Sequence, residues 1–167
     1  MEYRNEYDKD GVDIDDGKRA EANFVRIFTK RFGVAPIKTS AYVDKHDHID
    51  FYINVGKRRS SVDVKSWKKD PNYIWIEFIS YGKLGWLYGK AEYIAFERPD
   101  EQGFIVVKRQ KLRELVKRCC VVDFTDIKNE SLFRPYVRIK GKDNELYDCV
   151  TRIPREYLDE TNPWILE

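Results

Sequence analysis

Apolar and polar residues alternate along three successive stretches in the first half of the chain, a period of two that is typical of β-strands. Two shorter apolar runs follow and also predict strands. Between the two groups lies a segment rich in glycine and aromatic residues, residues 80–92. We expect it to be a crossover, part loop and part short helix, because a dozen residues is near the minimum for connecting parallel strands. The predicted strands are residues 49–55, 60–67, 73–80, 93–96 and 104–107.

A period near 3.6 predicts a helix over residues 17–32, ended by Gly33. At about 100° per residue, its apolar side chains form one arc, and Glu21 falls inside that arc. An acid on the inward face of a helix is unfavourable unless it is paired, protonated or bound to a metal. Alternatively, Glu21 in the first turn merely complements the helix dipole. The arc consists of Ala20, Phe24, Val25, Ile27, Phe28 and Phe32.

A second helix is predicted over residues 109–118, with an apolar inner side and a basic outer side that is a candidate nucleic-acid surface. Its expected outward residues are Lys108, Arg109, Lys111, Arg113, Lys117 and Arg118.

Beyond residue 118 the pattern shortens to two strands, residues 136–139 and 146–152, on either side of a polar turn. Together these elements predict a single α/β domain with a central mixed β-sheet flanked by helices and a small C-terminal β-hairpin extension. We divide the chain into an acidic N-terminal arm, a core and a C-terminal extension packed on the same domain, namely residues 1–16, 17–118 and 119–167.

The chain has 167 residues and 42% hydrophobic residues, which suits one folded domain. Its net charge of +2 is unevenly spread, because residues 1–16 hold seven acids against two basic residues. A basic body suits a polyanionic ligand, although a solvated surface explains the same charges. Three cysteines without C-x-x-C spacing, and no signal peptide, favour reduced thiols in the cytoplasm. No apolar run approaches the roughly 20 residues that span a bilayer, so we expect no membrane partner.

Acidic residues occupy unusual places on the first two strands. Asp50 lies near the start of one, and Asp63 and Lys65 share a face of the next, where aspartate is disfavoured. The D-x-K pattern occurs three times in the chain, but only this copy lies on a strong strand pattern. A carboxylate and an ammonium on one face can hold a metal ion and a reacting water side by side.

The candidate residues follow a definite order along the chain: Glu21 on the helix, Ile49-Asp50 on the first strand and Asp63-Val64-Lys65 on the second. In this order and spacing the chain resembles the PD-(D/E)XK nuclease superfamily, which has a restriction-endonuclease-like fold, and within it the small phage and bacterial members. The resemblance covers about residues 15–118. Ile49 stands where the family pattern has proline.

The resemblance implies a Mg²⁺- or Mn²⁺-dependent nuclease that hydrolyses phosphodiester bonds, with DNA as the expected partner. Asp50 and Asp63 would bind the ion, and the Val64 carbonyl could supply a third oxygen. Glu21 would bind through the metal or a metal-held water. Lys65 would position the attacking water and offset developing charge. Cutting both strands would favour a homodimer.

Other residues near this site are open to two interpretations. Glu77 on the third strand is either an additional metal-shell ligand or a solvated or lysine-paired acid. A loop cluster of His46, Asp47, His48 and Asp50 is a second candidate metal site, although such residues often only solvate a loop. Two basic turns could contact phosphate or be ordinary hairpin tips; they contain Lys57, Arg58, Arg59, Lys68 and Lys69.

Two other functions fit the same residues. The chain could be a non-catalytic nucleic-acid- or protein-binding module on a nuclease-like fold. It could also be a plain interaction domain, in which the acids make internal salt bridges with lysines. Convergence of Glu21, Asp50, Asp63 and Lys65 in space would favour the nuclease over the plain interaction domain.

Overall fold

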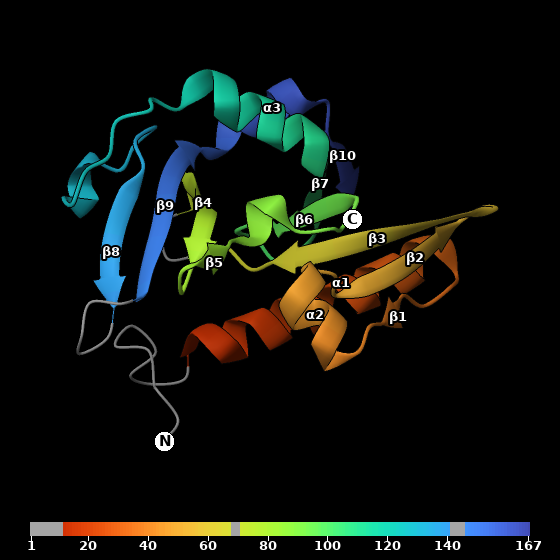
Figure 1. Ribbon diagram of the computed structural model, residues 1–167. Helices are drawn as coiled ribbons and strands as arrows, with labels where there is room; N and C mark the ends of the chain where they lie inside the picture. The colour runs from red at the N-terminus through yellow and green to blue at the C-terminus, as the bar shows by residue number, and fades with distance from the viewer. Residues whose placement is uncertain (1–11, 68–70, 141–145) are drawn as a thin grey trace.

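A six-stranded mixed sheet with strand order β1-β2-β3-β6-β7-β10 forms the centre of the protein (Figure 1). The computed structural model describes residues 12–67, 71–140 and 146–167. β3 and β6 pair in parallel, and the other neighbours pair antiparallel. The strands are β1 (Ile37–Lys38), β2 (Phe51–Val55), β3 (Arg58–Lys65), β6 (Tyr93–Glu97), β7 (Phe104–Lys108) and β10 (Trp164–Leu166).

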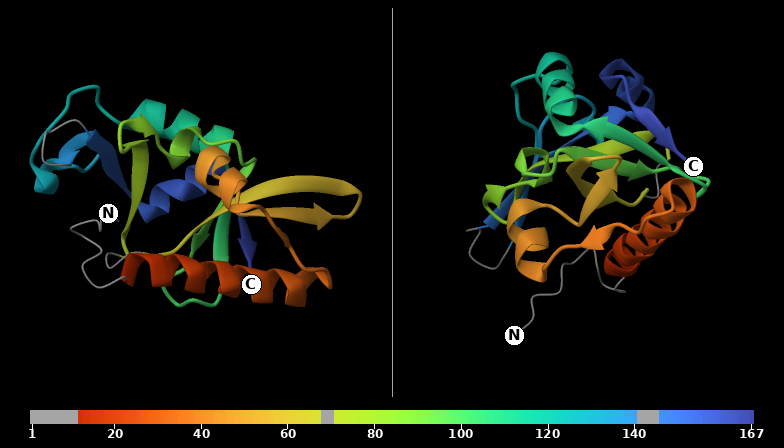
Figure 2. Two further views of the ribbon diagram at one scale, coloured as in Figure 1. Left: turned by 60° about the horizontal axis from the view of Figure 1, so that its bottom comes forward. Right: turned by 90° about the vertical axis from the view of Figure 1, so that its right-hand side faces the viewer.

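Two helices cover the two faces of this sheet, which confirms the predicted α/β class (Figures 1 and 2). They are α1 (Val12–Phe32) and α3 (Arg109–Cys119). On one face the apolar side chains of β2 and β3 pack against the apolar side of α1, as their alternation predicts. Phe24 of α1 lies 5.8 Å from the ring of Phe51 and 5.3 Å from that of Phe104. On the other face, Ile94 and Phe96 pack against α3.

The third predicted strand, β4 (Tyr73–Ser80), leaves the central sheet. The free edge of β3 is taken by β6, and β4 instead pairs with β9 in a second sheet of order β5-β4-β9-β8. The predicted C-terminal hairpin therefore supplies the main partner of β4, and β10 completes the central sheet. The remaining strands are β5 (Lys83–Leu84), β8 (Tyr136–Lys140) and β9 (Leu146–Pro154).

Short helical segments join these strands. α2 (Ala41–Asp47) precedes β2, and the predicted crossover between β3 and β6 contains the 3₁₀ helix η1 (Trp86–Tyr88). Two more 3₁₀ helices are η2 (Lys128–Glu130) and η3 (Arg155–Thr161).

The first helix is longer than its pattern predicts. It begins at Val12 rather than at residue 17, and it ends as expected at Gly33, whose φ of 70° suits glycine. Residues 1–11 of the predicted acidic arm lie outside the described residues. Among the described residues, no helix has the length and apolar composition needed to cross a bilayer.

A buried ion pair fixes α1 to the central sheet. Glu97 at the end of β6 is fully buried, and its two carboxylate oxygens accept hydrogen bonds from Arg19 of α1 at 2.9 Å each. Asn23 donates a third bond at 3.0 Å. The apolar period of α1 does not indicate this contact, because Arg19 lies outside the apolar arc.

Replacing Arg19 with methionine should destabilise the fold, because Glu97 would keep its burial and lose its cation. We expect the free energy of unfolding to fall by about 2 kcal/mol, less than for a fully buried pair because the Arg19 side chain is 35% exposed. Urea unfolding measures the change. The control is Lys18→Met on the exposed side of the same helix; an equal loss in both variants would contradict the prediction.

Candidate metal centre

The end of the β2–β3 pair holds the predicted carboxylates. The pairing of Phe51 with Val62 brings Asp50, which lies just before β2 rather than on the strand as predicted, close to Asp63 of β3. The Asp50 carboxylate accepts a hydrogen bond from the backbone N–H of Val64 at 2.6 Å, and the residue is 5% exposed. This contact ties Asp50 to the middle of the D-V-K sequence.

Three carboxylates from separate elements meet beside Asp50. One oxygen each of Glu21 on α1, Asp44 on α2 and Asp50 lie within 4.8 Å of one another. The ammonium of Lys38, on β1, contacts all three: its Nζ lies 2.5 Å from Glu21, 3.6 Å from Asp44 and 3.7 Å from Asp50. We call these four residues the acidic cluster. It is built around a cation that the protein itself supplies.

Asp63 lies next to this cluster and is held by two cations. Its Oδ1 is 2.7 Å from Nζ of Lys65, and its Oδ2 is 3.2 Å from a guanidinium nitrogen of Arg109. The Asp63 side chain is 3% exposed, whereas that of Lys65 is 26% exposed. The Lys65 ammonium also lies 5.3 Å from the centre of the Trp86 ring. Lys65 therefore has a fixed position and remains accessible.

The prediction that Arg109 points outward is wrong. Its side chain is 6% exposed and donates to Asp63 and to the backbone carbonyls of Ala91, Trp86 and His48. Arg109 is the first residue of α3, where the chain has just left β7, so its side chain reaches back to the sheet and neutralises a buried acid. The other basic residues predicted to face outward are exposed: Lys108, Lys111, Arg113, Lys117 and Arg118.

Burial and charge shift the pKa values of this centre. Burial raises the pKa of Asp50, and the neighbouring Asp63 charge raises it further, against Lys65 and the Val64 N–H. Burial also raises the pKa of Asp44. For Lys65, burial lowers the pKa but the charges of Asp63 and Asp50 outweigh it, so the pKa is raised. The same balance, dominated by Glu21 and Asp50, raises the pKa of Lys38. Both lysines therefore carry a positive charge at neutral pH.

Glu77 of the second sheet approaches the same region. It accepts a hydrogen bond from the backbone N–H of Trp86 at 3.3 Å. Burial raises the pKa of Glu77, and the charge of Lys65 opposes this rise. Two features fix Glu77 beside the crossover. A β-bulge follows Glu77, and Gly85 approaches so closely that a Cβ there would lie 2.5 Å from the Glu77 carbonyl oxygen.

The four predicted site residues thus lie in one region, but not as one ligand set. Glu21 and Asp50 belong to the acidic cluster, while Asp63 turns both oxygens toward cations. The acids do form internal ion pairs, as in a plain interaction domain, yet they converge rather than disperse. The sequence pattern did not indicate Asp44 or Lys38. Three carboxylates of this kind are the oxygen donors that Mg²⁺ and Mn²⁺ accept.

The other predicted residues have separate surroundings. His46 and Asp47 lie on α2 rather than on the predicted loop. His46 lies against the Tyr42 ring and Asp47 pairs with Lys90 at 2.8 Å, so each has its own partner. Lys57, Arg58 and Arg59 are exposed at the β2–β3 turn. Lys68 and Lys69 lie outside the described residues.

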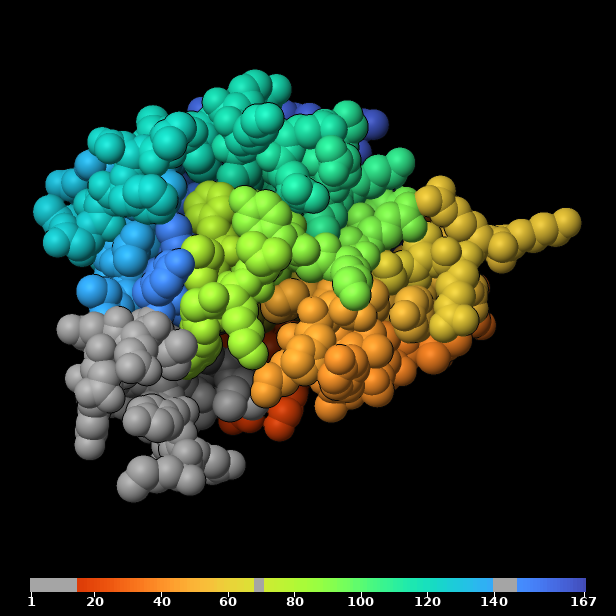
Figure 3. Space-filling model, viewed as in Figure 1, coloured from red at the N-terminus to blue at the C-terminus, as the bar shows by residue number. Residues whose placement is uncertain are grey.

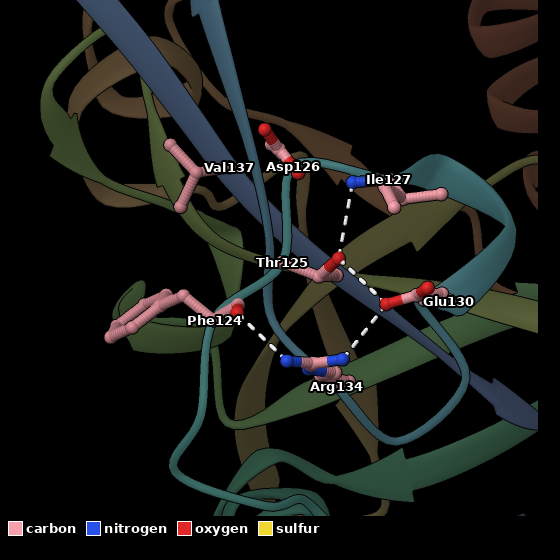
Figure 4. Close-up of a pocket in the computed structure, with 7 residues that line it drawn as sticks. All are labelled: Phe124, Thr125, Asp126, Ile127, Glu130, Arg134 and Val137. Atoms are coloured by element: carbon pink, nitrogen blue, oxygen red, sulfur yellow. Dashed lines mark hydrogen bonds and ion pairs between the residues drawn. The ribbon is translucent and has the colours of Figure 1, made fainter.

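A separate pocket of about 410 Å³ lies in the C-terminal part of the chain, in the segment that leads into β8 (Figure 4). Arg134 crosses it, donating to Glu130 at 2.8 Å and to the Phe124 carbonyl at 3.2 Å. Thr125 donates to the same Glu130 at 3.1 Å. The Nε of Arg134 is buried here without a hydrogen-bond partner among the described residues.

Comparisons with protein-family models, curated proteins and solved structures found no match. The geometry of the acidic cluster and of the Asp63–Lys65 pair therefore carries what can be inferred about function.

Removing the Lys38 ammonium should have opposite effects on the stability of the metal-free protein and on its response to a divalent ion. In Lys38→Met, three close carboxylates lose their shared cation, so we expect the metal-free protein to lose about 1–2 kcal/mol of stability. Mg²⁺ or Mn²⁺ should then raise the melting temperature more than in the wild type, because a divalent ion no longer competes with the lysine. Thermal melts with increasing metal measure both effects. Lys45→Met, on the exposed side of α2, is the control, and identical metal responses in all three proteins would refute the prediction.

The stability of the metal-free protein should also depend on Asp50 ionisation. The pKa of Asp50 is raised above its ordinary value of 3.8 in the folded state, so the folded protein binds this proton more tightly than the unfolded chain does. The resulting penalty is absent below pH 3.8, grows as pH rises through the raised pKa, and is constant above it. Asp50→Asn should therefore be more stable than wild type at pH 7–8, with the difference vanishing in acid. Melting curves from pH 4 to 8 test this, with the exposed Asp123→Asn as the control. A gain that persists at pH 4, or none at pH 8, would count against it.

Proposed function

We propose that this protein is a divalent-cation-dependent nuclease of the PD-(D/E)XK type, hydrolysing phosphodiester bonds with DNA as its expected substrate. One observation carries the proposal. The acidic cluster lies next to the Asp63–Lys65 pair, and the Val64 N–H links the two through Asp50. A carboxylate site for a hard cation and an accessible ammonium are the two components that phosphodiester hydrolysis requires.

Each residue has a distinct part in this proposal. Glu21, Asp44 and Asp50 would hold Mg²⁺ or Mn²⁺, with Lys38 displaced from their centre. The bound ion would supply charge for the phosphate and a more acidic water. Lys65, whose pKa is raised, acts as a positive hydrogen-bond donor to the phosphate or the attacking water rather than as a base.

Asp63 has a positioning role in this arrangement rather than the ligand role implied by the resemblance. Its Oδ1 holds the Lys65 ammonium at 2.7 Å, and Arg109 fixes the other oxygen from behind. Because backbone acceptors hold the buried Arg109 guanidinium in place, the Asp63 carboxylate cannot turn without losing its hydrogen bond to that guanidinium.

A non-catalytic binding module is the second candidate, and a specific observation favours it. Lys38 offsets part of the charge of the three carboxylates, and Asp63 is ion-paired with Lys65 and Arg109, so the protein supplies cations of its own at this site. A binding module predicts salt-sensitive nucleic-acid binding without metal-dependent cleavage.

Nuclease assays separate the two candidates. The purified protein is incubated with linear, circular, single-stranded and branched DNA in Mg²⁺, Mn²⁺ or EDTA. We expect metal-dependent cleavage that falls about a hundredfold or more in Asp50→Asn and in Lys65→Ala, since each removes charge stabilisation from the reacting phosphate. The exposed Glu114→Gln and Lys18→Ala are matched controls. Cleavage that persists in both site variants, or that needs no metal, would rule out this nuclease mechanism.

A further inference from the structure

A second surface of the central sheet combines aromatic rings with positive charge. At the end of α1, under the β2–β3 hairpin, lies a pocket of about 270 Å³. The Phe32 ring, 37% exposed, lies 6.5 Å from the Trp164 ring at an edge-on angle, and Tyr93 adds a third ring to the wall. The pocket is lined by Phe32, Ile53, Val55, Arg58, Ser60, Tyr93 and Trp164, and we call it the hairpin pocket.

Exposed cations are neighbours, in sequence or in strand register, of residues that line the hairpin pocket. Arg58 lines it and pairs with Glu92. Lys57 lies at the hairpin turn, which projects from the body at the right of Figure 3. Lys108 is the register partner of Tyr93, so the two side chains share a face of the sheet. Arg31 lies in the last turn of α1. Arg31, Lys57 and Lys108 are exposed, and none of the three forms an ion pair within the described part of the chain. Such a surface attracts a polyanion.

The hairpin pocket and the acidic cluster lie along the same strand. Phe51, Ile53 and Val55 alternate on the α1 face of β2, and the Lys38 ammonium lies 4.8 Å from the Phe51 ring. At about 3.3 Å per residue, Ile53 is about 10 Å and Val55 about 17 Å from Asp50. The distance from Val55 to Asp50 corresponds to about five nucleotides at the phosphate spacing of about 3.4 Å per nucleotide in a duplex strand. It corresponds to fewer nucleotides in a stretched strand.

We propose that the hairpin pocket seats an unpaired base of single-stranded nucleic acid, whose backbone then follows the outer edge of β2, beyond its short pairing with β1, to the acidic cluster. This inference rests on the proposed nuclease function and names its substrate class. Aromatic side chains bind bases through their faces, and the bases of a duplex are already stacked and paired. Arg31, Lys57 and Lys108 contact the phosphates on either side of the seated base.

Fluorescence anisotropy with a labelled single-stranded oligonucleotide and its duplex, in EDTA, measures binding without cleavage. The test variant is R31Q/K57Q/K108Q, and the charge-matched control is K18Q/K45Q/K83Q on other exposed surfaces. Loss of three phosphate contacts should weaken single-strand binding about tenfold to a hundredfold and reduce the salt slope by about two, at about 0.7 per contact. The control should bind as the wild type does. Equal weakening in both triple variants, or none in the test variant, would overturn the proposal.

A second variant tests the aromatic contribution. Phe32→Leu keeps an apolar side chain but removes the ring face, so single-strand affinity should fall about fivefold or more with the salt slope unchanged. Equal affinity of wild type for duplex and single strand, or wild-type affinity in Phe32→Leu, would also overturn the inference. Because these measurements exclude metal, a protein that binds single strands in this way but cuts nothing would refute the nuclease proposal alone.

Discussion

The buried carboxylate of Asp63 is the charge on which the arrangement of this protein depends. An isolated carboxylate in such a place is strongly unfavourable, so the fold must bring cations to it. Lys65 comes from the same strand, but Arg109 comes from the start of α3, beyond the whole crossover. The guanidinium also binds carbonyls of the crossover and of the turn after α2. One buried cation thereby connects β3, α3, the crossover and the turn after α2. The crossover and this turn pack closely: a Cβ added at Gly89 would lie only 2.6 Å from the Cβ of His48.

The acidic cluster follows from this packing. Once α2 is held against the crossover, Asp44 faces Asp50, and α1 brings Glu21 to the same point because the Arg19–Glu97 pair fixes its N-terminal half. Burial raises the pKa values of Asp44 and Asp50, so keeping both carboxylates ionised at this position is unfavourable. Residues arranged at the expense of stability are more common at functional sites than elsewhere.

The sequence could predict those features that depend on local periodicity. Alternation placed β2, β3 and their buried faces correctly, and the helical arc identified Glu21 as an inward acid. The alternation of β4 predicted a strand but could not reveal its neighbour, because the pairing with β9 joins segments about seventy residues apart. Arg109 lay on the polar side of a good helix pattern, and only the tertiary position of Asp63 makes it a buried cation. Lys38 and Asp44 come from a two-residue strand and a seven-residue helix, which are too short to give a periodic signal.

The position of Lys38 bears on whether the acidic cluster is a structural ion-pair network or a metal site. The Lys38 side chain is 44% exposed and two of its three acidic partners are also partly exposed, whereas Arg109, which pairs with the buried Asp63, is 6% exposed. Its β1 strand is only two residues long and lies at the edge of the sheet. The ammonium can therefore swing into water on its long aliphatic stem, and the contact that it gives up is the one between its Nζ and the Phe51 ring, 4.8 Å away. A divalent ion would bring twice the charge of Lys38 to the same oxygens. Replacing Lys38 with such an ion would require movement of the lysine side chain and no rearrangement of the core.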